Sequence, residues 1–282
     1  MATRDPGRRP ALVSRLDDAT LATLLLTSRL GGGGPPPLKA REFWALVAQV
    51  GGDPAGLLAA VPPGAADPDR VQALLDRATA FAFALEDLER SGLTVVSAFD
   101  PRYPAALRER LGHQAPPVLH AAGPTALLAQ PAVAFVAEAD TDPTDAARAI
   151  ARDRAVAAVR GGAAVLTGGT AGGVDATVTD VAGEADGTVI GLLADALTPR
   201  LRHPEVRRAI HAGRLCLATP YPPSAPWSPA AERGRLLVTT ALAERTVALD
   251  PRARSALDTA LADAEARGWP VERVRSDAAT DR

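Results

Sequence analysis

In the first third of the chain, apolar side chains recur every three or four positions, a period that predicts helices. We expect helices at 14–30, 38–50, 53–61 and 68–91. The glycine and proline run at 31–37 separates the first two, and Asp67-Pro68 is typical of a helix start. Residues 14–92 should therefore form a small all-helical domain, preceded by a polar, disordered tail at 1–13.

The pattern changes after Gly92, where short apolar runs alternate with helix-like stretches. We expect strands at 93–96, 132–137, 163–167, 188–193, 215–218, 246–249 and 271–274. Helices should connect the strands from 132 onward, two of them starting at Asp142-Pro143 and Ser228-Pro229. The segment 97–130 should contain turns and short helices, and 275–282 a polar tail. This alternation predicts βαβ units, a mostly parallel sheet and an α/β domain over 93–274.

Composition limits the classes of protein to which the chain can belong. Its 282 residues carry a formal net charge of −2, which argues against a globally basic nucleic-acid-binding protein. Lys39 is the only lysine, and we attribute the excess of arginine to a GC-rich genome. A single cysteine, Cys216, excludes a disulfide framework. With no signal peptide and no apolar run long enough to span a membrane, the sequence indicates a soluble cytoplasmic protein.

The most informative segment is a glycine-rich turn at 165–175, between a predicted strand and a predicted helix. Four glycines in six residues allow a tight turn, and the unpaired N–H groups of the opening helical turn then form an anion site. The candidate phosphate-binding residues are Thr167, Gly168, Gly169, Thr170, Gly172, Gly173 and Asp175. The spacing is neither a dinucleotide fingerprint nor a P-loop, so a turn that binds nothing is the alternative. For Asp175, helix capping is the favoured role.

Two groups of arginines are further candidates for phosphate contacts. Arg233 and Arg235 flank Gly234, but positions two apart on a helix point about 200° away from each other. Both can face one ligand only if the helix begins at or after Gly234. The second group is a possible basic stripe, for which an ordinary solvated surface is the alternative. It comprises Arg202, Arg207 and Arg208.

The sequence offers no catalytic or metal-binding constellation. Its four histidines lack a partner nucleophile or the spacing of metal ligands, and Cys216 lies within a predicted apolar strand. We therefore expect neither an enzyme nor a bound cofactor.

Several segments resemble DNA-processing protein A, also called DprA or Smf, and the resemblance covers about residues 14–274. It is strongest ahead of the glycine turn, where the spacing of Tyr-Pro, Pro-Pro and glycine matches in Phe99–Leu107, Ala115–Leu119 and Gly123. Other similar segments are the glycine turn itself, Gly187–Leu192, Arg233–Arg235 and Leu257–Ala260.

The resemblance implies an N-terminal helical domain, of the SAM or helix-hairpin-helix kind, joined to an extended Rossmann-like domain. It also implies a protein without enzymatic activity that binds single-stranded DNA and loads a RecA-type recombinase during natural transformation. A homodimer is a further possible assembly.

The chain departs from the family pattern where the family carries charged or polar side chains. The segment 136–139 lacks the family's glycine and arginine and introduces Glu138, while Gly172 replaces an arginine and Gly234 an asparagine. Each lost arginine removes a phosphate contact. Two other hypotheses therefore stay open, a sensor of a small nucleotide-derived ligand and a degenerate scaffold that binds protein.

Overall fold

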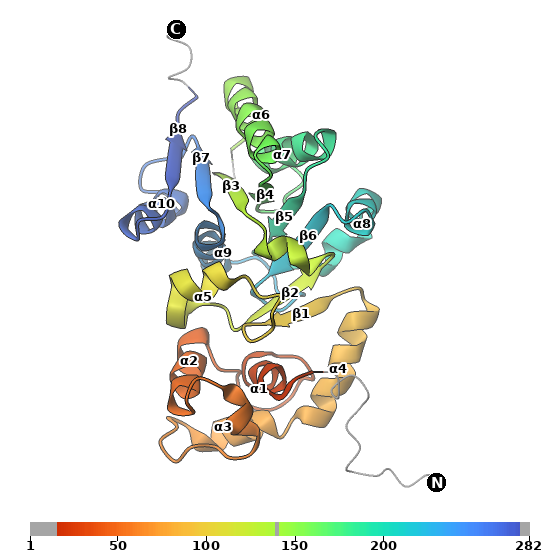
Figure 1. Ribbon diagram of the computed structural model, residues 1–282, viewed down its shortest axis with the longest axis vertical. Helices are drawn as coiled ribbons and strands as arrows, with labels where there is room; N and C mark the ends of the chain where they lie inside the picture. Colours follow the sequence, from red (N-terminus) through yellow and green to blue (C-terminus); the bar gives the residue numbers. More distant parts are fainter. Residues whose placement is uncertain (1–15, 139–140, 277–282) are drawn as a thin grey trace. The chain divides into compact units, whose positions relative to one another are not determined.

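The computed structural model describes residues 16–138 and 141–276. The predicted tail at 1–13 and residues 277–282 of the predicted polar tail lie outside these ranges. The chain forms two compact units. Among the described residues, the first contains 16–103 together with Gly112–Leu119, and the second contains Pro104–Leu111, 120–138 and 141–276. Figure 1 labels their helices and strands.

The first unit is built mainly from helices, as its apolar period predicts. Its elements are α1 (Asp18–Thr27), α2 (Ala40–Gln49), the 3-10 helix η2 (Pro54–Leu58), α3 (Pro68–Leu75), α4 (Ala78–Arg90), strand β1 (Thr94–Ser97) and the 3-10 helix η3 (Gly112–Gln114). Leu21 and Leu24 of α1, Phe43 of α2 and Leu74 of α3 are completely buried. These apolar side chains form the core of the unit and hold the helices together.

The prediction of one continuous helix at 68–91 is wrong, because α3 ends before Asp76 and α4 begins at Ala78. At the break, the guanidinium of Arg77 donates hydrogen bonds to the carbonyls of Leu25 and Ser28. These contacts reach about fifty residues back along the chain, so no local pattern reveals them. The apolar period continues through both helices and hides the break.

The second unit alternates strands and helices. Its elements are α5 (Ala105–Leu111), β2 (Val118–Ala122, of which His120 onward belongs here), η4 (Thr125–Ala129), β3 (Ala132–Ala137), α6 (Asp145–Arg160), β4 (Ala164–Thr167), α7 (Gly173–Glu184), β5 (Val189–Leu192), η5 (Thr198–Arg202), α8 (Pro204–His211), β6 (Leu215–Thr219), α9 (Pro229–Leu242), β7 (Arg245–Leu249), α10 (Ala256–Ala266) and β8 (Val271–Val274).

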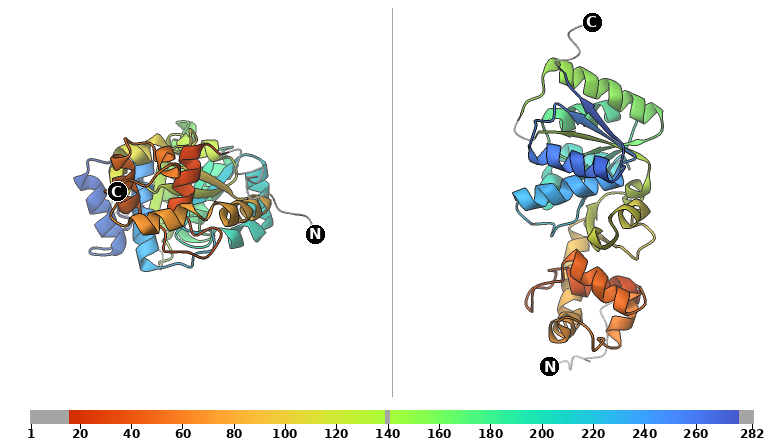
Figure 2. Two further views of the ribbon diagram at one scale, coloured as in Figure 1. Left: turned by 90° about the horizontal axis from the view of Figure 1, so that it is seen from below. Right: turned by 90° about the vertical axis from the view of Figure 1, so that its left-hand side faces the viewer.

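The sheet of the second unit has the strand order β2-β6-β5-β4-β3-β7-β8. Strand β2 runs antiparallel to β6, and the other neighbours are parallel. Strands β3 to β6 advance in one direction along the sheet, and β7 and β8 in the other. Right-handed crossovers therefore place α6 and α7 on one face and α9 and α10 on the other (Figures 1 and 2). This is the mostly parallel, Rossmann-like α/β fold that we expected.

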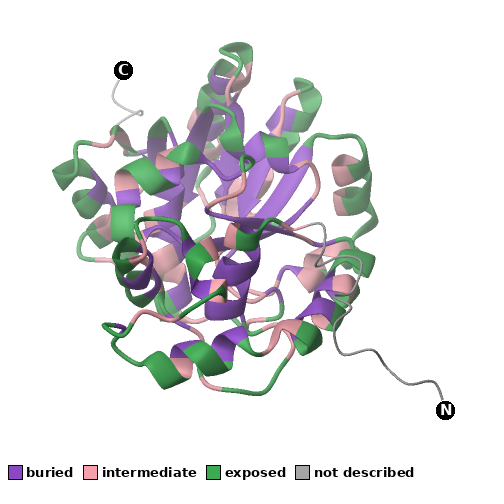
Figure 3. Ribbon diagram, turned by 60° about the horizontal axis from the view of Figure 1, so that its bottom comes forward, coloured by how far each residue is buried: buried purple, intermediate pink, exposed green. Residues whose placement is uncertain are grey.

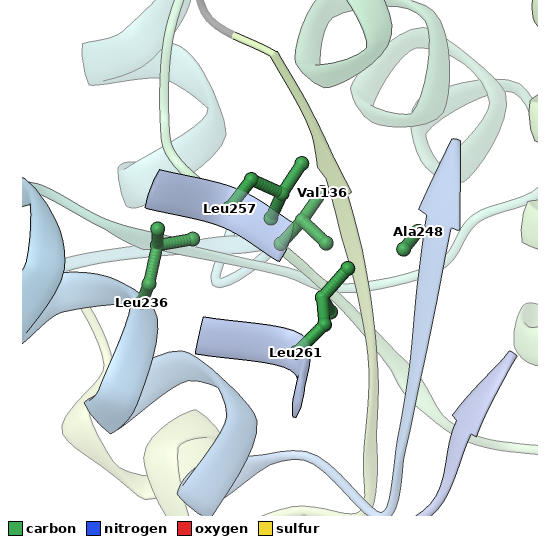
Figure 4. Packing of buried hydrophobic residues seen from close by; sticks show 5 residues of the cluster. All are labelled: Val136, Leu236, Ala248, Leu257 and Leu261. Atoms are coloured by element: carbon green, nitrogen blue, oxygen red, sulfur yellow. The ribbon is translucent and has the colours of Figure 1, made fainter. Parts of the chain in front are cut away.

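Strands β2 to β7 of this sheet are buried along nearly their whole length, which explains their largely apolar sequences, whereas the edge strand β8 is not buried (Figure 3). On the face covered by α9 and α10, one cluster joins β3 and β7 to these helices (Figure 4). It consists of Val136, Leu236, Ala248, Leu257 and Leu261. The cluster holds Leu236, in the middle of α9, beside the end of β3, and Leu236 directly follows Arg235 of the site described below.

Two further expectations differ from the structure. Val118–Ala122 forms strand β2, although the sequence predicts only turns and short helices there. The strand exists because it pairs with β6, about a hundred residues later, and its five residues are buried. Helix α6 begins at Asp145 and not at Asp142-Pro143, because the Thr144 hydroxyl accepts a hydrogen bond from the Ala147 N–H and caps the helix.

Candidate functional site

A pocket of about 510 Å³ lies at the carboxyl ends of β3, β4 and β5 in the second unit. Its wall includes Ala137 at the end of β3, Gly168 directly after β4 and Ala194 shortly after β5. The first residues of α7 and part of α9 complete it. Open α/β sheets bind ligands beyond the carboxyl ends of their strands, so this pocket is the candidate site.

The glycine-rich turn forms one side of the pocket because it packs closely on β5. Gly169 has a φ of 69°, and a Cβ there would lie 2.5 Å from Leu193 Cδ2 and 3.5 Å from the Cα of Gly191. The Thr167 hydroxyl accepts a hydrogen bond of 3.0 Å from the Gly169 N–H. Only glycine fits at position 169, since any side chain would lift the turn off the sheet.

Helix α7 begins at Gly173, and its first turn lines the pocket. The N–H groups of Gly173, Val174 and Asp175 have no acceptor within the helix, because the residues that would supply one precede it. The helix dipole adds partial positive charge at the same place. The predicted anion-binding helix terminus therefore borders the pocket.

Asp175 does not cap α7, contrary to the favoured expectation. The N-cap residue is Gly172, and the Asp175 carboxylate accepts hydrogen bonds from the Thr170 N–H (3.1 Å) and hydroxyl (2.9 Å). Asp175 already lies inside the first turn of the helix, so its side chain reaches back to the preceding turn of chain. It holds that turn in shape and leaves a negative charge next to the free N–H groups.

Arg235 of α9 is the buried cation of the pocket, with 8% of the residue exposed. Its Nε donates to Glu232 Oε2 at 3.0 Å, and its Nη2 donates to Glu232 Oε1. Its Nη1 has no hydrogen-bond acceptor among the described residues. A Cβ on Gly168 would lie 3.3 Å from this Nη1, so the unsatisfied donor lies directly beside the glycine turn.

Arg233 is exposed and does not line the pocket. Helix α9 starts at Pro229 and is capped by Ser228, whose hydroxyl accepts from the Ala231 N–H at 3.0 Å. Both arginines therefore lie within the regular helix, where positions two apart face different sides. The structure brings Arg235, and not Arg233, to the glycine turn.

Gly234, between the two arginines, makes room for an aromatic side chain. The Tyr221 hydroxyl donates to the Ala231 carbonyl at 2.8 Å, and a Cβ on Gly234 would lie 2.1 Å from the same hydroxyl oxygen. Burial raises the pKa of Tyr221, and the nearby Glu232 carboxylate adds to this effect. The glycine that replaces the family's asparagine is thus matched to a tyrosine packed on the helix.

The pocket wall carries more carboxylates than arginines. Each arginine has an acidic partner, since Arg235 pairs with Glu232 and Arg200 pairs with Asp195 at 3.0 Å. The other carboxylates of the wall belong to Glu138, Asp142 and Asp175. Among the described lining residues, five carboxylates therefore stand against two arginines, and the wall has a net negative charge.

The family model for DNA recombination-mediator protein A matches residues 94–268, which is more than half of the chain. The chain belongs to the DNA recombination-mediator protein A family. The resemblance to DNA-processing protein A is thereby confirmed. No curated protein sequence gives a significant match.

Two solved structures of DNA processing protein A are similar to this member of the family. The protein from Streptococcus pneumoniae aligns with a TM-score of 0.63 and 16% identity, covering 92% of this chain and 86% of its own. The protein from Helicobacter pylori, reported with its single-stranded DNA binding mode, aligns with a TM-score of 0.53 and 19% identity, covering 64% and 80%. At these identities the similarity shows a shared fold.

The motif ahead of the glycine turn, which carried the resemblance to the family, has structural roles in this chain. Within the first unit, the Tyr103 hydroxyl donates a buried hydrogen bond of 2.7 Å to the Pro116 carbonyl. Within the second unit, Gly123 has a φ of 101°, and a Cβ there would lie 2.4 Å from the Leu215 carbonyl oxygen. None of these residues lines the pocket. The motif therefore identifies the fold better than it identifies the site.

The predicted basic stripe lies outside the pocket wall. Its three arginines belong to η5 and α8, and each is exposed. None of the three forms an ion pair with another described residue, so their charges face solvent without a partner. They are Arg202, Arg207 and Arg208.

Within residues 16–138 and 141–276, no group of three or more histidine, cysteine, aspartate or glutamate side chains is arranged to hold a metal ion. In the same ranges, no helix combines the length and the apolar character needed to cross a membrane. Cys216 lies in β6, where burial raises the pKa of its thiol to about 12. The thiol therefore stays protonated and is a poor nucleophile.

Sequence reasoning missed Trp227 and the acidic surplus of the pocket wall. Trp227 lines the pocket and is 57% exposed. The available signal was its position directly before Ser228, at a predicted helix start, in a chain with few aromatic residues. The carboxylates come from separate segments, so only the folded chain brings them together.

Proposed function

We propose that this protein binds single-stranded DNA at the pocket beside the glycine turn and serves DNA processing without catalysing a reaction. Family membership supports a role in DNA recombination, and the similar Helicobacter pylori protein is described with a single-stranded DNA binding mode. The observation that carries the proposal is the unsatisfied Nη1 of Arg235, which lies beside Gly168 where the N-terminus of α7 opens. A buried donor without an acceptor needs a partner, and an anion supplies one.

We propose that a phosphate of the strand contacts the free N–H groups of α7 and draws Arg235 Nη1 toward it. The contacting residues would be Gly168, Thr170, Gly172, Gly173, Asp175 through its N–H, and Arg235. Thr167 and Gly169 would support the turn from outside the pocket wall. Outside the pocket, exposed arginines attract further phosphates and release counterions. These would be Arg233 and the stripe of Arg202, Arg207 and Arg208.

The test is the affinity for a labelled single-stranded oligonucleotide, measured by fluorescence anisotropy at two salt concentrations. We expect Arg235→Ala to weaken binding about tenfold and to reduce the salt slope by about one, with a smaller loss for Arg233→Ala. Arg235→Lys keeps the charge and controls for damage to the fold. Arg160→Ala, an exposed substitution at the end of α6, should change nothing. Unchanged affinity and slope in both Arg233→Ala and Arg235→Ala would show that the site lies elsewhere.

The absence of catalysis is tested separately. Labelled strands incubated with the protein and nucleoside triphosphates should be recovered with unchanged length and ends. Cleavage or extension of the strand would contradict this part of the proposal.

We further propose that the protein acts in the cytoplasm, during DNA uptake by natural transformation, and that the bound strand is passed to a RecA-type recombinase by a homodimer of this chain. The family description as a recombination mediator supports the recombinase as partner. Recombinase filament formation on single strands should be faster in the presence of the protein, and sedimentation should report a dimer. An unchanged filament rate would remove the recombinase from the proposal and leave DNA binding in place.

A further inference from the structure

Trp227 is an exposed aromatic side chain on the wall of a polar pocket. It is 57% exposed, whereas most large apolar side chains of this unit are buried. It directly precedes Ser228, which caps α9, the helix that carries Arg235. The indole therefore belongs to the same wall as the cationic and helix-terminal groups, where a flat apolar surface can stack on a ring.

The anion-binding part of the same pocket consists of main-chain and side-chain donors. The first turn of α7 supplies free N–H groups, and Arg235 supplies one buried donor without an acceptor. Nη1 is closed off from solvent here, so an anion reaches it only when the arginine side chain or the turn at Gly168 moves slightly. That movement satisfies a donor which is otherwise left unpaired.

The acidic surplus of the wall limits the charge of the anion. Five carboxylates line the pocket. Glu232 and Asp195 pair with arginines of the wall, and Glu138 pairs with Arg252 at 3.3 Å. Asp142 and Asp175 have no ion-pair partner among the described residues. A ligand with several phosphate charges meets repulsion from these two, whereas a ligand with one negative charge meets less. Carboxylates also accept hydrogen bonds from amino groups such as those on the edges of nucleobases.

We propose that the pocket holds one nucleotide unit of a nucleic-acid strand, with its phosphodiester at the N-terminus of α7 and its base stacked on Trp227, and that it rejects nucleoside polyphosphates. This inference rests on the proposed function and specifies its ligand. A phosphodiester carries one negative charge, and every base offers a face for stacking. The pocket would thus select strands over free triphosphates by charge.

The stacking contact is tested with Trp227→Ala and Trp227→Phe in the full chain. Base stacking on an aromatic side chain contributes enough that Trp227→Ala should weaken oligonucleotide binding about tenfold, and Trp227→Phe less. Phe83→Ala is the matched control, because Phe83 is a comparably exposed aromatic side chain (51%) of the first unit. Addition of an oligothymidylate should quench tryptophan fluorescence in the wild type and much less in Trp227→Phe. Equal affinities for wild type and Trp227→Ala would overturn the inference.

The charge selection is tested by tryptophan quenching with three unlabelled ligands: a dinucleoside monophosphate, a nucleoside monophosphate and a nucleoside triphosphate. We expect the dinucleoside monophosphate to quench at the lowest concentration and the triphosphate at the highest. Asp142→Asn removes an exposed carboxylate of the wall. It should reduce about twofold the ratio between the quenching concentrations of the triphosphate and the dinucleoside monophosphate. A triphosphate that binds the wild type as tightly as the dinucleoside monophosphate would contradict the selection.

The outcomes separate this inference from the proposed function. Oligonucleotide binding that depends on Arg235 but not on Trp227 would leave the function standing and remove the stacked base. Tight binding of a free nucleotide without oligonucleotide binding would overturn both and would favour a nucleotide sensor. Binding of neither ligand class would also overturn both and would leave a protein-binding scaffold.

Discussion

The ionisable side chains of the second unit occupy two contrasting environments. Arg235 and His120 are buried, whereas the basic stripe of α8 and η5 is exposed and unpaired among the described residues. Burial forces a charged group to take a partner or to lose its charge, and Arg235 accordingly comes with Glu232. Exposed arginines keep their charge but contribute little to stability. The same residue type is thus buried and paired in the pocket, and exposed and unpaired in the described part of the stripe.

Among the buried groups, His120 should have the largest effect on the free energy of unfolding. Burial lowers the pKa of His120 to about 4. The unfolded chain binds a proton at this histidine near pH 6.5, whereas the folded chain does so only near pH 4. Burial of the neutral His120 therefore does not lower the free energy of unfolding above about pH 6.5. As the pH decreases from there to about 4, the free energy of unfolding falls by about 3 kcal/mol. Urea unfolding of the wild type and of His120→Leu at pH 7 and pH 4.5 measures this.

The control for this prediction is His113, which is exposed on η3. His113→Gln, measured under the same conditions, controls for the loss of an exposed histidine. His120→Leu should make the pH dependence of the free energy of unfolding shallower between pH 6.5 and pH 4. If both variants follow the wild type, His120 is not held neutral by burial, and the contrast between buried and exposed groups loses its strongest case.

The next largest effect concerns the fit of α9 around Arg235. Gly234→Ala places a Cβ where the Tyr221 hydroxyl lies, at 2.1 Å, and we expect a loss of about 2 kcal/mol in the free energy of unfolding from overpacking. The double variant Gly234→Ala with Tyr221→Phe removes the clashing oxygen. The free energy of unfolding of the double variant should therefore lie close to that of Tyr221→Phe alone, so that most of the loss caused by Gly234→Ala disappears. Additive effects in this double-mutant cycle would show that the two positions are not coupled.

A smaller effect is expected from breaking the buried ion pair. Glu232→Gln leaves the Arg235 charge without its counter-charge, and we expect a loss of about 1–2 kcal/mol, because both side chains keep some exposure. The matched control is Glu184→Gln, which breaks the exposed pair with Arg152 at 2.9 Å and should cost about 0.5 kcal/mol or less. Equal losses of stability in the two variants, measured by thermal unfolding, would mean that the ion pair of the pocket stabilises the protein no more than the exposed pair does.

The parts of the fold that local sequence patterns determine were predictable. The alternation of strands and helices, the glycine turn after β4 and the capped start of α9 all follow from short-range periods and turn residues. Strand β2 escaped prediction because its pairing with β6 is remote in sequence, and the break at Arg77 because its hydrogen-bond partners lie in and just after α1.

The candidate site was only partly predictable for a related reason. The glycine turn is one continuous segment, so its backbone geometry can be inferred from five or six residues. The charge of the pocket is instead a sum over β3, the turn, the end of β5 and α9, which only the sheet topology brings together. The opposite directions of Arg233 and Arg235 followed from the helix start at Pro229, which Ser228-Pro229 already indicates.

The smallest effect on stability is expected for the exposed arginines of the basic stripe. Arg207→Ala and Arg208→Ala should change the free energy of unfolding by less than about 0.5 kcal/mol, because each side chain is solvated and unpaired among the described residues. If the DNA strand runs along the basic stripe, each of the two substitutions should weaken oligonucleotide binding about two- to threefold at low salt. Neither should have an effect at high salt. A variant of the pocket behaves differently, since Arg235→Ala should keep part of its loss at high salt, where screening spares buried contacts. Parallel salt curves for Arg208→Ala and Arg235→Ala would place both arginines in the same environment and contradict the separation of pocket and stripe.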